Sequence, residues 1–248
     1  HSKYSRAVSK NMVIPVMARW GRKKGIDLLA TGDWMHPLWL RELQAALTEG
    51  TDGIFVSRED PDGAKFLLSA EISSIYSQGG QGRRVHTLVF SPSFATAERI
   101  IEKLLARGCN LLSDGRPIVG LSALEIAEIV FSVDERCLVI PAHAWTPWFA
   151  LYGSKSGFDS VEECFGDWAS RIYAIETGLS ADPLMNWRVG DVERRAIVSF
   201  SDAHSPVKLG REATVFTQNG KLKMENGKLN FSYDDIYNAI AERFTGRN

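Results

Sequence analysis

The sequence is poor in cysteine and has almost no net charge. Its 248 residues include three cysteines, Cys109, Cys137 and Cys164, and no two of them form a C-x-x-C pair. This argues against a disulfide framework or a cysteine-bound zinc, and it predicts a protein of the reducing cytoplasm. The formal net charge of -1 gives no overall basic footprint, so a nucleic-acid partner would need basic residues concentrated locally.

Long apolar runs and several enzyme motifs are also missing. No apolar run approaches the roughly 18 residues of a membrane span, and no signal peptide is apparent. The patterns G-x-G-x-x-G, G-x-x-x-x-G-K-[ST] and G-x-S-x-G do not occur. We therefore expect no membrane partner, no glycine-rich phosphate loop and no nucleophile-elbow serine.

Apolar, strand-like runs alternate with segments of helical spacing. The expected strands are 25–33, 66–76, 83–92, 137–145, 171–178 and 196–204, and the clearest helices are 37–50, 94–108 and 121–134. Ser122 and Glu125 have the spacing of a capping box, and two Asn-Gly steps within 212–232 predict a β-hairpin. The alternation predicts an α/β fold with a largely parallel sheet, closed into a barrel because no phosphate loop is present. In such barrels functional side chains gather at the carboxyl ends of the strands.

The five histidines recur in one kind of position. In "AIVSFSDAHSP" (196–206) an apolar strand is followed directly by Asp202 and His204. His36, His86 and His143 also lie in or just past apolar runs, and His1 opens the chain. A single histidine near a strand is more often a core or surface residue than a ligand. The recurrence indicates side chains that converge on one face, as in a metal site.

Two glutamates lie in similar places. Glu71 is inside an apolar strand, where an unpaired charge is costly, and His86 on the next strand is a candidate partner. For Glu176, in "YAIETG", a hydrogen-bonding or ion-pairing role is the stronger alternative to metal ligation. Imidazole and carboxylate groups without thiolate suit zinc, manganese or iron. Two or more ions held close together favour hydrolysis of a phosphate ester.

In this order the motifs resemble the PHP (polymerase and histidinol phosphatase) superfamily. They read "HS", "GDWMH", "AEIS", "RRVHT", "PAHAW" and "SDAHSP". The resemblance implies a distorted (β/α)7 barrel that binds two to three divalent ions, zinc or manganese with magnesium or iron as alternatives. It implies these ligands: His1, Asp33, His36, Glu71, His86, His143, Asp202 and His204. One ion would be held by His1, Glu71 and Asp202, a second by Glu71, His86 and His143, and a third position would be completed by Asp33, His36 and His204.

Longer segments resemble one family of this superfamily, endonuclease Q. They include "HSKYSRAVSKNM", "IETGLSADPLMNWR" and "SDAHSPVKLGREATVF". The resemblance implies a metal-dependent DNA repair endonuclease that hydrolyses the phosphodiester 5′ of a deaminated base (uracil, hypoxanthine or xanthine) or an abasic site. Glu71, Asp202 and His204 would be catalytic. Residues 1–248 would be the catalytic barrel, trimmed before His1 and lacking the family's C-terminal zinc-binding and helical region.

A damaged base in a duplex must leave the stack to be recognised, and it then needs aromatic walls and hydrogen bonds to its edge. Candidates beside the motifs are Trp145, Trp148, Trp187 and Asn186, although for any single tryptophan structural packing is the stronger alternative. Candidate phosphate contacts near the motifs are Lys3, Arg6, Arg84, Arg188 and Lys208.

Two other functions fit the same residues. The first is a PHP-type phosphatase or phosphoesterase that acts on a small phosphorylated metabolite. The second is a non-catalytic PHP module of a larger DNA-processing protein, which the retention of so many ligand positions disfavours. Substrate panels separate the first from an endonuclease, and metal content separates the second.

Overall fold

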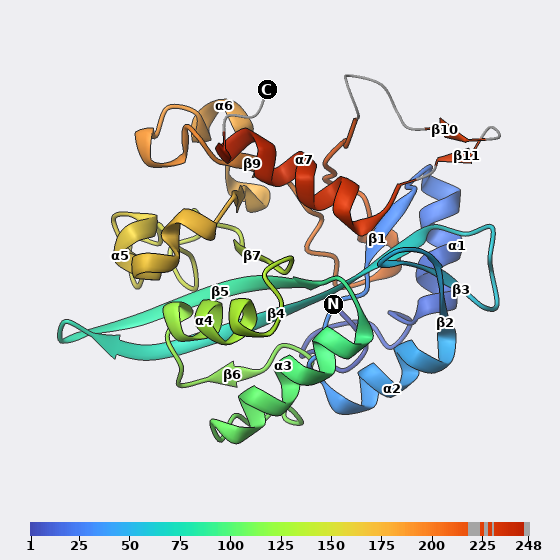
Figure 1. The fold of residues 1–248 in the computed structure, drawn as a ribbon, viewed down its shortest axis with the longest axis horizontal. Helices are drawn as coiled ribbons and strands as arrows, with labels where there is room; N and C mark the ends of the chain where they lie inside the picture. The colour runs from blue at the N-terminus through green and yellow to red at the C-terminus, as the bar shows by residue number, and fades with distance from the viewer. Residues whose placement is uncertain (218–223, 226–227, 230, 246–248) are drawn as a thin grey trace.

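The computed structural model describes residues 1–217, 224–225, 228–229 and 231–245 (Figure 1). The helices are α1 (Ile14–Lys24), α2 (Pro37–Ala46), α3 (Phe94–Ala106), α4 (Ala123–Val133), α5 (Val161–Phe165), α6 (Pro183–Asn186) and α7 (Tyr233–Thr245). The strands are β1 (Leu28–Ala30), β2 (Leu47–Thr51), β3 (Ile54–Ser57), β4 (Lys65–Gln78), β5 (Gln81–Ser91), β6 (Ile118–Val119), β7 (Leu138–Pro141), β8 (Ala174–Glu176), β9 (Ala196–Val198), β10 (Met224–Glu225) and β11 (Lys228–Leu229). The helix predicted over 37–50 ends at Ala46, because residues 47–51 pair with β3 instead.

The main sheet follows the order β2-β3-β4-β5-β7, and β1 and β6 also pair with β4. Strands that are neighbours in this order are antiparallel, whereas β1 and β6 run parallel to β4. The prediction of a largely parallel sheet is therefore wrong for the described strands. The reason is local: two-residue connections join β2 to β3 and β4 to β5, and such short connections can link only antiparallel strands. Gly79 and Gly80 have φ of 60° and 76°, which the tight β4–β5 turn requires.

The strands that follow form smaller sheets. β8 and β9 are a parallel pair that is not hydrogen-bonded to the main sheet in the described part of the chain. The mixed α/β fold is confirmed, and the closed (β/α)7 barrel stays a prediction. β10 and β11 pair in antiparallel fashion, but the two Asn-Gly steps of the predicted hairpin, at 219–220 and 226–227, lie outside the described residues.

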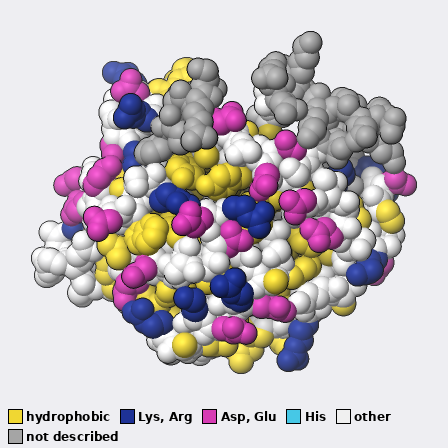
Figure 2. Space-filling model, in the orientation of Figure 1, with side chains coloured by type: hydrophobic (Ala, Val, Ile, Leu, Met, Phe, Trp, Pro, Cys, Tyr) yellow, Lys and Arg dark blue, Asp and Glu magenta, His cyan; other side chains and the backbone are white. Residues whose placement is uncertain are grey.

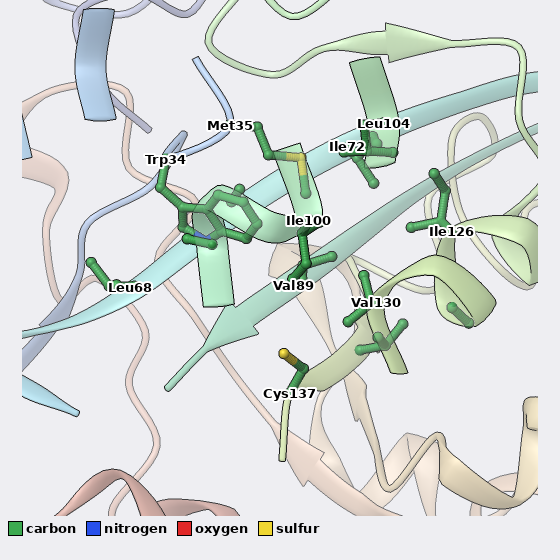
Figure 3. Packing of buried hydrophobic residues seen from close by; sticks show 14 of the residues in the cluster. Trp34, Met35, Leu68, Ile72, Val89, Ile100, Leu104, Ile126, Val130 and Cys137 are labelled. Atoms are coloured by element: carbon green, nitrogen blue, oxygen red, sulfur yellow. The ribbon is translucent and has the colours of Figure 1, made fainter. Parts of the chain in front are cut away.

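The long β4–β5 hairpin separates two apolar clusters. Alternate residues of β4, among them Leu68 and Ile72, pack against α3 and α4 (Figure 3). On the opposite face, Leu67 belongs to a second cluster with residues of β7, β8, β9 and α7, including Tyr233. Farther along this second face of β4, the next three side chains are the polar residues Ser69, Glu71 and Ser73. The candidate site therefore shares one face of β4 with the second cluster, and the first cluster packs against the opposite face.

Capping residues fix the helices that cover the first cluster. Ser122 and Glu125 form the predicted capping box at the start of α4, and the Ser93 hydroxyl caps α3. The face shown in Figure 2 mixes Lys and Arg with Asp and Glu side chains, in keeping with the small net charge. Among the described residues, no helix combines the length and the apolar character needed to cross a bilayer.

Candidate metal centre

Glu71 and His86 lie on the same face of the β4–β5 hairpin. The register pairs Glu71 with Leu88 and Ser73 with His86, so the carboxylate and the imidazole are diagonal neighbours. Glu71 Oε1 lies 2.5 Å from His86 Nδ1, and both residues are buried. The two side chains converge because of antiparallel register, whereas the sequence analysis expected parallel strand ends to meet at one edge.

His143 joins this pair from the end of β7. The backbone N–H of Ala142 donates to the carbonyl of His86, and His143 Nε2 then lies 3.1 Å from His86 Nδ1 and 3.5 Å from Glu71 Oε1. The backbone of His143 is left-handed, with φ of 31°. Asp33 and Asp202 share this rare conformation, with φ of 56° and 42°. Such strain in non-glycine residues often marks functional sites.

Glu176, at the end of β8, supports the loop of His143. Its carboxylate accepts hydrogen bonds from the backbone N–H groups of His143, Gly178 and Phe200. Burial raises the pKa of Glu176 despite these donors and the nearby imidazole of His143. Glu176 thus has the hydrogen-bonding role that the sequence analysis gave as the stronger alternative.

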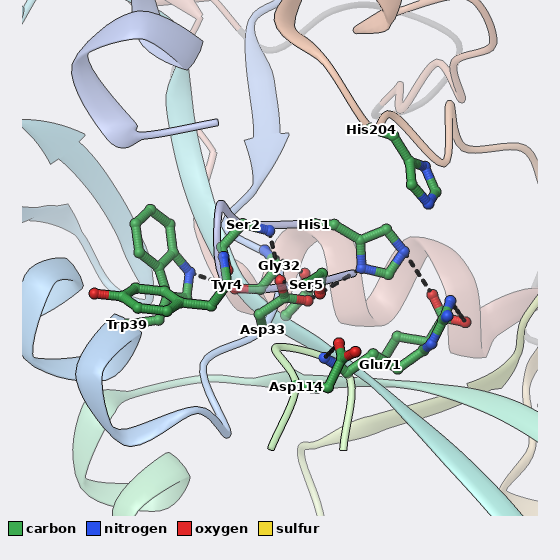
Figure 4. Close-up of polar contacts among 12 residues, drawn as sticks. His1, Ser2, Tyr4, Ser5, Gly32, Asp33, Trp39, Glu71, Asp114 and His204 are labelled. Carbon is green, nitrogen blue, oxygen red and sulfur yellow. Dashed lines mark hydrogen bonds and ion pairs between the residues drawn. The ribbon is translucent and has the colours of Figure 1, made fainter. Parts of the chain in front are cut away.

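A second group of side chains lies beside the first. His1 Nε2 is 3.2 Å from Asp202 Oδ1, and His204 Nδ1 is 3.7 Å from the same oxygen. The rings of His1 and His204 are 4.9 Å apart between centroids (Figure 4). Burial lowers the pKa of His1, but hydrogen bonds with the surrounding carboxylates, Asp202 first, raise it well above its ordinary value.

Glu71 connects the two groups. Its Oε1 faces His86 and His143, and its Oε2 lies 3.1 Å from His1 Nε2. Burial would raise the pKa of Glu71, but the charge of His86 and the hydrogen bond with His1 hold it well below its usual range. One carboxylate therefore presents one oxygen to each group.

The donor atoms fit divalent metal ions. Two groups among the described residues bring their ligand atoms within 4.8 Å of one another: Glu71, His86 and His143, and His1, Asp202 and His204. The buried Glu71 Oε1 accepts no hydrogen bond from the described residues, although the His86 nitrogen is close. Three ligand atoms that converge on a buried carboxylate oxygen with no hydrogen-bond partner suit a shared cation, and imidazole with carboxylate suits zinc, manganese or iron.

Asp33 and His36 lie outside both groups. Asp33 is fully buried and lies 3.1 Å from His1 Nδ1, and it accepts hydrogen bonds from the Ser2 backbone N–H and the Ser5 hydroxyl. The ring of His36 stacks on Tyr4 at 4.4 Å, and burial lowers the pKa of His36. The structure places His204 with His1 and Asp202 rather than with Asp33 and His36, and a third ion position stays a prediction.

The aromatic candidates divide by exposure. Trp145 stacks on Tyr152 and donates from Nε1 to Asn186 Oδ1 at 2.7 Å. Asn186 is completely buried, and its amide nitrogen donates to the backbone carbonyl of Asp182, so both ends of its amide are used internally. In this structure the amide of Asn186 links Trp145 to α6, and a role for Asn186 in reading a base edge stays a prediction. Trp148 and Trp187 are each 47% exposed.

Most of the candidate cationic residues are exposed. Arg84 lies over the ring of Trp148, 4.9 Å from its centroid. Lys3 forms an ion pair with Glu42 at 2.9 Å. The remaining exposed candidates are Arg6, Arg188 and Lys208. Exposed side chains of this kind can contact an anion.

Arg116 is a site residue that the sequence analysis missed. Its Nη1 lies 3.5 Å from Glu71 Oε1. The preceding "SDG" indicates a turn but no contact with β4, so the signal was too weak to place Arg116 near Glu71.

Comparisons with known proteins support this description of the chain. The chain matches no protein-family model. It is 32% identical over 208 residues to the uncharacterized protein YqxK of Bacillus subtilis (strain 168), which covers 79% of this chain and 49% of that protein. It resembles the crystal structure of the lesion-specific endonuclease PfuEndoQ from Pyrococcus furiosus with a TM-score of 0.78 and 34% identity, over 97% of this chain and 54% of that one. It also resembles a structure of endonuclease Q in complex with a 27-mer duplex substrate that has an abasic lesion at the active site. The TM-score is 0.78 and the sequence identity is 33%, over 100% of this chain and 55% of that one.

Fold and site together define a mixed α/β protein with a candidate multinuclear metal centre. Its resemblance to the PHP superfamily, and within it to endonuclease Q, is confirmed. The chain spans about half the length of each of these three proteins.

Proposed function

We propose that residues 1–248 are the catalytic unit of a metal-dependent DNA repair endonuclease. Its reaction is hydrolysis of the phosphodiester 5′ of a deaminated base or an abasic site. The observation that carries the proposal is the position of Glu71 between two ligand groups. It is supported by the resemblance of 97% of this chain to part of a lesion-specific endonuclease.

The site residues have two roles: some would bind the metal ions, and others position those ligands. His86 and His143 would hold one zinc or manganese ion with Glu71, and His1, Asp202 and His204 would hold a second. Ions held in this way supply a nucleophile from water near neutral pH and neutralise charge on the phosphate. Asp33 orients the His1 ring, and Glu176 fixes the backbone of His143.

DNA would approach over exposed aromatic and cationic side chains. Trp148 and Trp187 offer aromatic faces for a base that has left the stack. Arg84 lies beside Trp148, and Arg188 directly follows Trp187, so each exposed indole has a cation at hand for a phosphate. The small net charge predicts modest affinity with a shallow dependence on salt.

The test is strand cleavage by the purified protein with manganese or zinc. The substrates are duplexes that contain one hypoxanthine, one uracil, one abasic site or no lesion. The control is Asp202→Asn, because asparagine tolerates the left-handed backbone at this position better than alanine does. We expect a nick 5′ of the lesion that is lost in the control. Release of phosphate from a small ester without cleavage of any duplex contradicts the proposal and favours the metabolite phosphatase.

A further inference from the structure

Arg116 brings a positive charge to the carboxylate that joins the two ligand groups. Its Nη1 is 3.5 Å from Glu71 Oε1, and 29% of its side chain is exposed. The side chain thus reaches from solvent to the interior of the candidate site. Glu71 itself is 5% exposed, so the pair lies at the boundary between the buried ligands and the space open to a substrate.

The backbone on both sides of Arg116 is fixed to elements that carry the site. The N–H of Gly115 donates to the carbonyl of Tyr4, and a Cβ on Gly115 would lie 2.5 Å from an oxygen of Asp33. This close approach requires glycine. After Arg116, the carbonyl of Pro117 accepts the N–H of Ser73, and β6 then runs parallel to β4.

The preceding residue Asp114 adds a further attachment. Its carboxylate accepts the backbone N–H groups of Arg6 and Arg116, at 3.3 and 3.0 Å. Figure 4 shows Asp114 near Glu71, on the same side of His1. The position of Arg116 is therefore set by the chain segment that follows His1 and by the strand that carries Glu71, and not by a freely moving loop.

A cation in this place has no use in holding metal ions. Two divalent ions would carry more positive charge than the carboxylates of Glu71, Asp202 and Asp33 offset, and Arg116 would add positive charge next to them. Such an excess favours an anion in the same space, and a guanidinium presents several N–H groups in a plane that matches the oxygens of a phosphate.

We propose that Arg116 is a substrate-contacting residue that donates hydrogen bonds to a non-bridging oxygen of the phosphodiester that is cleaved. The proposal rests on the proposed function, since it assigns a residue to the same reaction. Glu71 holds the guanidinium in place when no substrate is present, and the phosphate takes over part of this contact when it binds.

The experiment compares wild type with Arg116→Ala and Arg116→Lys, each checked first for metal content by elemental analysis. Arg107→Ala is the control, because Arg107 pairs with Glu125 on α4, away from the site. At unchanged metal content we expect cleavage of lesion DNA to fall about 10²–10³-fold in Arg116→Ala. Arg116→Lys should recover part of the loss, since it keeps the charge but not the planar donor arrangement. A loss of metal that parallels the loss of activity overturns the proposal, because Arg116 would then act by stabilising Glu71.

A methylphosphonate at the scissile position gives a second criterion. In each of its two diastereomers, a methyl group replaces one of the two non-bridging oxygens. Wild type and Arg116→Ala should therefore cleave the diastereomer that lacks the contacted oxygen at similar rates. If Arg116→Ala loses as much activity on both diastereomers as on the normal phosphodiester, the contact between Arg116 and the phosphate is contradicted.

Binding of inorganic phosphate to the metal-loaded protein separates this inference from the proposed function. If the wild type cleaves no DNA but binds phosphate more tightly than Arg116→Ala does, the role of Arg116 stands and the endonuclease assignment fails. Equal phosphate affinity in the two proteins overturns the role of Arg116.

Discussion

Asp33 Oδ1 lies 3.1 Å from His1 Nδ1, which leaves Nε2 of the same ring directed at Glu71 and Asp202. A buried carboxylate behind an imidazole fixes its tautomer and orientation, and the loss of such a partner typically weakens metal binding about 10- to 100-fold. We expect this decrease in Asp33→Asn, measured by calorimetric titration with zinc or manganese. Asp167→Asn, at an exposed carboxylate between α5 and β8, is the control. Equal affinity in both variants would show that Asp33 does not orient His1.

Glu71→Gln tests whether one carboxylate serves both ligand groups. An amide cannot present an oxygen to each group, so we expect the variant to lose at least one bound ion per chain and its hydrolytic activity. Elemental analysis gives the metal content, and circular dichroism checks that the fold is retained. Glu102→Gln, at an exposed glutamate of α3, should leave both unchanged. Full metal content in Glu71→Gln would exclude a bridging role.

Gly178→Ala should disturb the metal centre through the backbone. Gly178 has φ of 63°, and an added Cβ would lie 2.6 Å from the Cβ of His143. We expect the free energy of unfolding to fall by more than about 1 kcal/mol and metal affinity to fall with it. Gly190→Ala is a matched control, because nothing lies within 4 Å of its added Cβ and its φ is not positive. Similar stability of the two variants would contradict the close contact with His143.

The capping box of α4 gives a stability prediction that is independent of the site. Ser122→Ala removes the hydroxyl that accepts from the Glu125 N–H, and the free energy of unfolding should fall by about 1 kcal/mol. Urea denaturation measures the change, with Ser154→Ala in an exposed loop as the control. A difference of less than a few tenths of a kcal/mol between these variants would show that the cap contributes little.

The same capping box predicts a dependence on pH. The Ser122 backbone N–H, then its hydroxyl and Arg107, hold the pKa of Glu125 below its ordinary value of 4.5. A lowered pKa in the folded protein means that this stabilisation is present above pH 4.5 and is lost as the pH falls through the folded-state pKa. The stability difference between wild type and Glu125→Gln should therefore shrink between neutral pH and about pH 3. A constant difference would contradict the assignment.

The sequence predicted the identity of the candidate site residues better than the strand arrangement that brings them together. The apolar runs over 66–76 and 83–92 identified β4 and β5 as successive strands, and hence His86 as a candidate partner of Glu71. That the two strands form an antiparallel hairpin came from the structure. The same local signals could not give the direction of the other strands. The short connections between successive strands determine their antiparallel direction. The prediction of a largely parallel sheet was wrong because it did not take the length of these connections into account.

Contacts between distant segments were the least predictable. Asn186 follows exposed residues of α6, and nothing local shows that Trp145 fills the space beside it. Arg116 reaches Glu71 only because β6 pairs with β4, a contact that no periodicity reveals. The roles of Asn186 and Arg116 both depend on neighbours that are distant in the sequence.

The contact between His1 and Asp202 joins two segments that are 201 positions apart in the sequence. Contacts so far apart in sequence contribute to high contact order, and they form only after the loop between them has closed. The half of the site formed by His86 and Glu71 lies within one hairpin and can be organised early. Completion of the other half is then a late step of folding. Metal ions bound across both halves would hold these distant segments together, and chelation would loosen both halves at once.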